Sequence, residues 1–115
     1  MSDPIRAQSA PATGPSQARI ASTGPNKYAV SGPLTFATAR GALASGIAAF
    51  SSASGSPIEV DFAAVGAADS AGLAVLLEWL AWARRSGREL RYSHVPEAIC
   101  AIARICEVES LLLRR

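Results

Sequence analysis

The feature that most constrains this chain is a strand that leads through a short turn into a long apolar helix. Residues Pro57 to Ala63 alternate in polarity, and a period of two residues is typical of a β-strand with one buried face. A turn is expected at residues 66–68, after which Asp69 or Ser70 is placed to cap a helix that continues to about Arg85. This pattern predicts a domain in which helices are layered on a sheet.

A hairpin is predicted near the beginning of the chain. Short runs at residues Ala18 to Thr23 and Lys27 to Ser31 lie on either side of Gly24-Pro25-Asn26, a sequence that is typical of a turn between two strands. Gly32-Pro33 is expected to end the second of these strands, since both residues interrupt a regular ladder.

A helix is predicted from Thr35 to Phe50. Its large apolar residues recur at spacings of seven, four and three residues, which places them on one helical face. Gly41 and Gly46 are expected to weaken this helix, each by up to about 1 kcal/mol relative to alanine. The residues on the predicted apolar face are Phe36, Leu43, Ile47 and Phe50.

The last part of the chain repeats the pattern of a strand followed by a helix. Ser86-Gly87 is expected to end the preceding helix, and residues Arg88 to Ser93 are expected to form another strand. Pro96 suits the first position of a final long helix. One stripe of that helix is predicted to carry Ile99, Ile102, Ala103 and Cys106. The predicted order is β-β-α-β-α-β-α, in an α/β domain with a small mixed sheet covered by helices.

The composition limits the size and class of the protein. The chain has 115 residues, 50% of them apolar and 17% charged, which excludes a disordered chain and leaves room for one domain. Residues 1–17 contain almost no large apolar side chain and are expected to form a flexible tail before a domain at residues 18–115. The longest uncharged stretch, Gly41 to Ile58, is too polar to cross a bilayer and no secretory signal precedes it, so a cytoplasmic location without direct membrane insertion is expected.

The distribution of charge argues against nucleic-acid binding. The formal net charge is +2, but residues 57–115 carry seven arginines and eight acidic residues. A nearly neutral folded half lacks the basic surface with which proteins contact a phosphate backbone. Nucleic acid is therefore not an expected partner.

The two cysteines and the single histidine argue against a disulfide or a metal centre. Cys100 and Cys106 are six residues apart in one predicted helix, where a rise of about 1.5 Å per residue separates their Cα atoms by about 9 Å, too far for a disulfide. One histidine and no Cys-x-x-Cys pair provide too few ligands for structural zinc. Both thiols are expected to lie in or near the core.

A catalytic function is also disfavoured. Ser70, Glu89 and His94 occur in the chain order of one class of hydrolase. The strand-to-helix turn of those enzymes carries Gly-x-Ser-x-Gly, but Ala68 replaces the first glycine. Residues 66–72 also lack the Gly-Lys-Ser/Thr ending of a phosphate-binding loop. We therefore expect no catalytic residue and no cofactor, although a nucleotide could lie at the N-terminus of the helix.

The stretch from Val60 to Leu77 resembles the STAS domain, the fold of bacterial anti-sigma-factor antagonists and of sulfate-transporter tails. The resemblance covers about residues 18 to 113, and its most specific part is the Asp-Ser-Ala-Gly-Leu step that begins at Asp69. This step and the residues after it look most like the MlaB branch of the family, which supplies the STAS subunit of a phospholipid-transporting ABC complex in Gram-negative bacteria. Anti-sigma-factor antagonists more often have Ser or Thr at the place of Ala71 and Gly at the place of Ala74.

Several roles are open for the polar residues of this step. From the residues alone, Ser70 either caps the helix, which is worth about 1 kcal/mol, or exposes a hydroxyl to a partner or to phosphorylation. The resemblance implies that Ser70 is the phosphorylation site if the chain is an anti-sigma-factor antagonist, and lies against the ATPase if it is MlaB-like. Asp61 and Asp69 occupy positions that are acidic in the family, and the residues alone assign them turn and cap chemistry.

The helix that begins near Ser70 carries two apolar stripes on roughly opposite sides, at about 100° per residue. One stripe consists of Leu73, Leu76, Leu77 and Leu80, and the other of Val75, Trp79 and Trp82. One stripe can face the sheet, and the other is packed by neighbouring helices, packed by the N-terminal tail, or exposed to a partner. In the last case one partner would cover Asp69, Ser70, Ala71, Val75, Trp79 and Trp82.

These observations leave three functions. The favoured one is a non-catalytic subunit that binds and regulates or stabilises the ATPase of a phospholipid-transporting ABC complex, and through it contacts a permease at the inner membrane. Such a subunit would support lipid asymmetry of the outer membrane. The alternative is an anti-sigma-factor antagonist that is switched by phosphorylation of Ser70. The third, an enzyme, lacks a complete catalytic motif.

Overall fold

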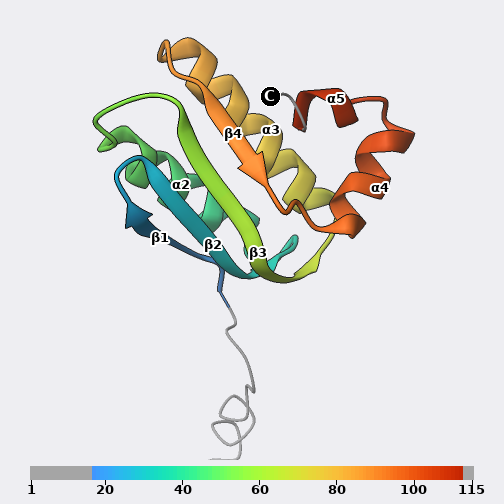
Figure 1. The fold of residues 1–115 in the computed structure, drawn as a ribbon. Coiled ribbons are helices and arrows are strands. Elements are labelled where there is room, and N and C mark those ends of the chain that lie inside the picture. The colour runs from blue at the N-terminus through green and yellow to red at the C-terminus, as the bar shows by residue number, and fades with distance from the viewer. Residues whose placement is uncertain (1–16, 113–115) are drawn as a thin grey trace, which may run out of the picture.

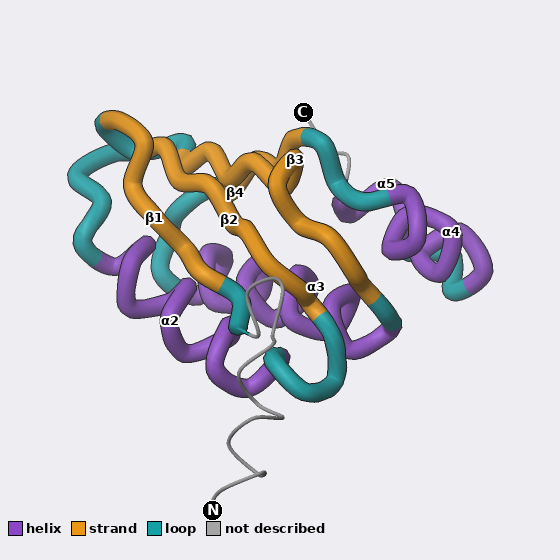
Figure 2. The backbone as a smooth tube through the Cα atoms, turned by 90° about the horizontal axis from the view of Figure 1, so that it is seen from below, coloured by secondary structure: helices purple, strands orange, loops and turns teal. Residues whose placement is uncertain are grey.

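The computed structural model describes residues 17–112, which form a four-stranded sheet with helices packed against one face (Figures 1 and 2). The strands lie in the order β1-β2-β3-β4, in which β1 is antiparallel to β2, while β2, β3 and β4 are parallel. Each parallel connection contains a helix, because two parallel strands cannot be joined by a tight turn. The strands are β1 (Arg19–Gly24), β2 (Lys27–Leu34), β3 (Ile58–Ala68) and β4 (Leu90–Ser93).

Two helices form the layer against the sheet. Helix α2 (Ala39–Ser51) joins β2 to β3, helix α3 (Ser70–Arg85) joins β3 to β4, and the two helices pack against each other. Helices α4 (Glu97–Ile105) and α5 (Glu109–Leu112) lie beside α3 at one end of the domain. The predicted α/β fold and element order are confirmed, with α5 as an addition. Within residues 17–112, no helix is long and apolar enough to cross a membrane.

The two central strands are longer than predicted. The turn expected at residues 66–68 is wrong, because β3 continues to Ala68 and stays paired with β2 as far as Leu34. Gly32-Pro33 does not end β2 either, since the register shifts there and a shifted position tolerates a proline without an N–H. Gly32 has a φ of 84° at this point, which glycine adopts without steric cost. The tail predicted at residues 1–17 lies outside the described residues, except for Gln17.

Helices α2 and α3 meet where Gly46 faces Trp79. The indole ring of Trp79 is fully buried, and a Cβ added at Gly46 would overlap it. The indole N–H donates to the backbone carbonyl of Leu43 at 3.2 Å. The ring also packs edge-on against Phe50, with 5.1 Å between the ring centroids. Gly46, which was expected only to weaken its helix, therefore allows the close approach of the two helices.

This contact predicts opposite effects for two glycines of the same helix. Gly46→Ala should lower the free energy of unfolding by about 1–3 kcal/mol, since the added methyl group forces apart a packed core. Gly41→Ala should raise it by up to about 1 kcal/mol, because Gly41 has open space around its Cα. Urea unfolding monitored by tryptophan fluorescence measures both changes. Equal effects of the two substitutions would contradict the packing described here.

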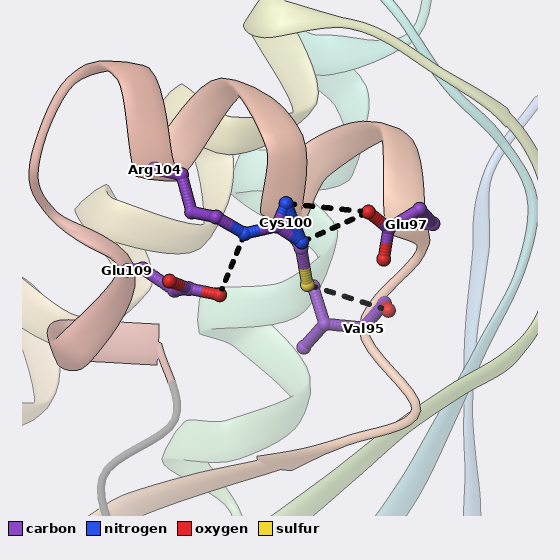
Figure 3. A network of polar contacts seen from close by, with 5 residues as sticks. All are labelled: Val95, Glu97, Cys100, Arg104 and Glu109. Atoms are coloured by element: carbon purple, nitrogen blue, oxygen red, sulfur yellow. Dashed lines mark hydrogen bonds and ion pairs between the residues drawn. The ribbon is translucent and has the colours of Figure 1, made fainter.

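The last two helices are joined by one arginine. Arg104 contacts Glu97 of the same helix at 2.9 Å and Glu109 of α5 at 3.2 Å (Figure 3). Between the helices, Glu107 has a φ of 62°, a left-handed conformation that interrupts the helical path. The single long helix predicted here is therefore wrong, because α4 ends before this residue. Cys106, predicted in the apolar stripe, is exposed at the end of α4.

The two cysteines lie in different environments. Cys100 is buried, as predicted, and its thiol lies 3.7 Å from the carbonyl oxygen of Val95 (Figure 3). Burial raises the pKa of the Cys100 thiol, and the negative charges of Glu97 and Glu109 raise it further. Cys106 is exposed, so the expectation that both thiols lie in or near the core is correct only for Cys100.

This difference predicts selective alkylation. Because the thiolate is the reacting species, Cys100 should react with iodoacetamide at pH 8 at least about tenfold more slowly than Cys106, through both its raised pKa and its burial. Peptide mapping by mass spectrometry after timed quenching measures the two rates. In urea the rates should become similar. Similar rates in the folded protein would contradict the burial of Cys100.

Candidate protein interface

The carboxylate of Asp69 joins the start of α3 to the turn that precedes α2. One of its oxygens, Oδ1, accepts the backbone N–H of Ala71 at 2.8 Å and thereby caps α3. The other, Oδ2, accepts the backbone N–H of Phe36 at 3.1 Å. The cap predicted for either Asp69 or Ser70 therefore belongs to Asp69, and the hydroxyl of Ser70 is exposed on the first residue of the helix.

Phe36, which was expected on the apolar face of a helix, is exposed next to this cap. The hydroxyl of Thr38 donates to the carbonyl of Pro33 at 2.8 Å and accepts the N–H of Thr35 at 3.0 Å. These bonds hold the segment in a turn, so α2 begins after Thr38 and not at Thr35 as predicted. Phe36 is 85% exposed and lies before the helix, not on its apolar face as predicted. Thr35 and Thr38 were the sequence signal for this turn, because threonine hydroxyls compete for backbone groups and favour turns.

The surface around Ser70 is made of small residues, one aromatic side chain and the carboxylate of Asp69. Ala74 is exposed one helical turn after Ser70, so both lie on the same face of α3. Ala71, the residue after Ser70, is half-buried. Both oxygens of the Asp69 carboxylate are already bonded to backbone N–H groups. We refer to Phe36, Asp69, Ser70, Ala71 and Ala74 as the α3 entry surface.

Two of the three residues in the second apolar stripe of α3 are buried in the core and are not available to a partner, which corrects part of the predicted interface. Val75 is 3% exposed and Trp79 is fully buried. Trp82 is half-buried and lies against Phe50, with 6.2 Å between the ring centroids. Within residues 17–112, Trp79 and Trp82 of this stripe pack against the neighbouring helix α2.

The second apolar stripe is packed inside the domain because α3 has neighbours on several sides. On one side α2 accepts Trp79 at Gly46, and α4 and α5 pack against other parts of the helix. Strand β4 contributes Tyr92, whose hydroxyl donates to the carbonyl of Leu76 at 2.6 Å, and burial raises the pKa of Tyr92 well above its usual value. A helix with neighbours on several sides needs more than one apolar stripe, so two stripes do not by themselves indicate an interface.

The acid and the histidine of the hydrolase order, Glu89 and His94, have different partners. Asp61 accepts the N–H of Ala63 at 2.9 Å and lies 3.0 Å from Nδ1 of His94. Glu89 is paired instead with Arg91 at 2.9 Å. Glu89 precedes β4 and His94 follows it, so the strand separates the acid and the histidine of the hydrolase order. Asp61 lies within β3 and bonds there to the backbone of Ala63, so it does not belong to the turn expected from the residues alone.

The mixed four-stranded sheet with its connecting helices is consistent with the fold of a STAS domain. A family model described as "Mlab, STAS domain" matches residues 21–114. The chain therefore belongs to the STAS domain family, and within that family it is similar to MlaB. A comparison with curated proteins finds no match.

The cap assignment can be tested by stability. Asp69→Ala should lower the free energy of unfolding by about 1–2 kcal/mol, since it removes the cap of α3 and leaves the N–H of Phe36 without its acceptor. Ser70→Ala should leave stability within about 0.5 kcal/mol of the wild type, because its side chain is exposed. Urea unfolding measures both values. A larger loss for Ser70→Ala than for Asp69→Ala would assign the cap to Ser70.

Proposed function

We propose that the protein is a non-catalytic subunit that binds and regulates or stabilises the ATPase of a phospholipid-transporting ABC complex. It would contact the permease only through the ATPase, on the cytoplasmic side of the inner membrane, and serve lipid asymmetry of the outer membrane. The family match supports this function. The observation that carries it is that Ser70, where the resemblance to MlaB implies contact with the ATPase, is exposed at the centre of the α3 entry surface.

The α3 entry surface has the properties of a protein contact. Its small side chains allow close approach of a partner, and its aromatic residue offers a large apolar area. The carboxylate of Asp69 is satisfied by two backbone N–H groups of the same chain. Covering it therefore leaves both carboxylate oxygens with donors, which reduces the cost of burying this charge.

A subunit without catalytic groups can still change the activity of an ATPase. The ATPase passes through different conformations during its cycle, and a bound domain shifts their populations only if it binds them with different affinities. The domain has a packed core that includes the fully buried Trp79. Its effect would be to favour the conformation of the ATPase that fits the α3 entry surface.

A negative charge at Ser70 should weaken this contact. Ser70→Asp places a second carboxylate beside Asp69 in a surface that becomes covered, and an unpaired buried charge is costly. We expect at least a tenfold loss of affinity for the purified ATPase, whereas Ser70→Ala should change the affinity by less than about threefold. Isothermal titration calorimetry measures both. Ser110→Asp is a matched control, since Ser110 is also exposed, also follows an acidic residue and also lies at the start of a helix.

Co-purification from native membranes tests the function itself. The tagged chain should bring down an ABC ATPase and its permease, and removal of the chain should change ATP hydrolysis by the complex. If it instead brings down a serine kinase, and intact-mass analysis shows a phosphorylated fraction that Ser70→Ala removes, the protein is an anti-sigma-factor antagonist. If no ATPase is recovered and hydrolysis is unchanged without the chain, the proposed function is wrong.

A further inference from the structure

We propose that Phe36 is the anchor of this interface and inserts into an apolar pocket of the ATPase, while Arg40 meets a carboxylate at the rim of that pocket. The proposal rests on the function proposed above and specifies the chemistry of the partner surface. Asp69 is then the positioning residue that holds Phe36 at the head of α3. Three observations support this proposal: Phe36 is exposed, its turn is held by hydrogen bonds, and Arg40 forms no ion pair with any residue between 17 and 112.

Phe36 is a large apolar side chain that no other part of the described chain covers. It is 85% exposed, although a phenylalanine is among the side chains that gain most from burial. The other large apolar residues exposed in the described part of the chain are Ile105 and Leu111, which lie on α4 and α5. Phe36 is thus the large apolar residue of the α3 entry surface, where Ser70 and Ala74 leave room for a partner to approach.

The turn that carries Phe36 is held in place before any partner binds. Its backbone N–H is bonded to Oδ2 of Asp69 at 3.1 Å. Two residues later, the buried Thr38 bonds the carbonyl of Pro33 and the N–H of Thr35. Ordering a flexible loop on binding reduces affinity, so an aromatic side chain on an already ordered turn is a favourable anchor.

Arg40 supplies the charge that selects the partner surface. It lies four residues after Phe36, is exposed in the first turn of α2, and forms no ion pair within residues 17–112. A cation at the N-terminal end of a helix is locally unfavourable, because the helix dipole is positive there. A carboxylate of the partner would neutralise both charges at once. We therefore infer an acidic rim around the apolar pocket.

The central experiment compares two exposed apolar residues. Phe36→Ala should weaken binding of the purified ATPase at least tenfold in isothermal titration calorimetry, and Phe36→Leu should restore part of the affinity. Ile105→Ala is the matched control, because Ile105 is 82% exposed on α4, and it should change the affinity by less than twofold. All three variants should keep the wild-type urea midpoint, since neither side chain is part of the core.

Two further measurements test Arg40 and Asp69. Arg40→Glu should weaken binding and reduce its dependence on salt, whereas Arg85→Glu, at the opposite end of α3, should change neither. Asp69→Ala should weaken binding by a larger factor in the wild type than in Phe36→Ala, because a positioning residue has little to position once the ring is gone. Equal factors in the two backgrounds would remove the positioning role of Asp69.

The outcomes separate this proposal from the function on which it rests. If the wild type binds the ATPase and Ser70→Asp does not, but Phe36→Ala behaves like Ile105→Ala, the function stands and the anchor is wrong. If Arg40→Glu binds as tightly as Arg85→Glu, the acidic rim is wrong. If the wild type does not bind the ATPase, both proposals are overturned.

Discussion

The position of Trp79 beside Gly46 determines how the rest of the domain is arranged. The indole ring occupies the space that a side chain at residue 46 would need, so α2 and α3 lie closer together than two helices with larger residues could. The turn that precedes α2 and the head of α3 are consequently held next to each other. This proximity allows one carboxylate, that of Asp69, to bond the backbone of both segments.

The sequence predicts the parts of this structure that depend on local pattern. The alternation around Val60 and the cap followed by an apolar run at Asp69 correctly indicate β3 and α3. The same reasoning places Phe36 in the helix, which is wrong, and does not decide whether Trp79 is buried or exposed to a partner. A helical period shows which residues share a face, but not what covers that face. Hydrogen bonds of Thr38 to nearby backbone groups keep Phe36 out of α2. Trp79 packs against Gly46 of α2, which is distant in the sequence.

The candidate interface is correspondingly only partly visible in the sequence. Asp69, Ser70 and Ala71 form a continuous motif, and the resemblance to STAS domains identifies them. Phe36 comes from a separate segment and joins them only through a hydrogen bond between residues 33 positions apart. Val75 and Trp79 lie on the same helix as the motif but belong to the core. Proximity along the chain is therefore a poor guide to this surface.

The packing of α3 on several sides has a mechanical consequence. Protein interiors are close-packed and barely compressible, so a displacement at one end of a surrounded helix is passed to its neighbours and is not absorbed locally. A force applied to Ser70 would reach the sheet through Tyr92 and the outer helices through their contacts with α3. The domain would therefore move with a partner as one rigid body and would not bend.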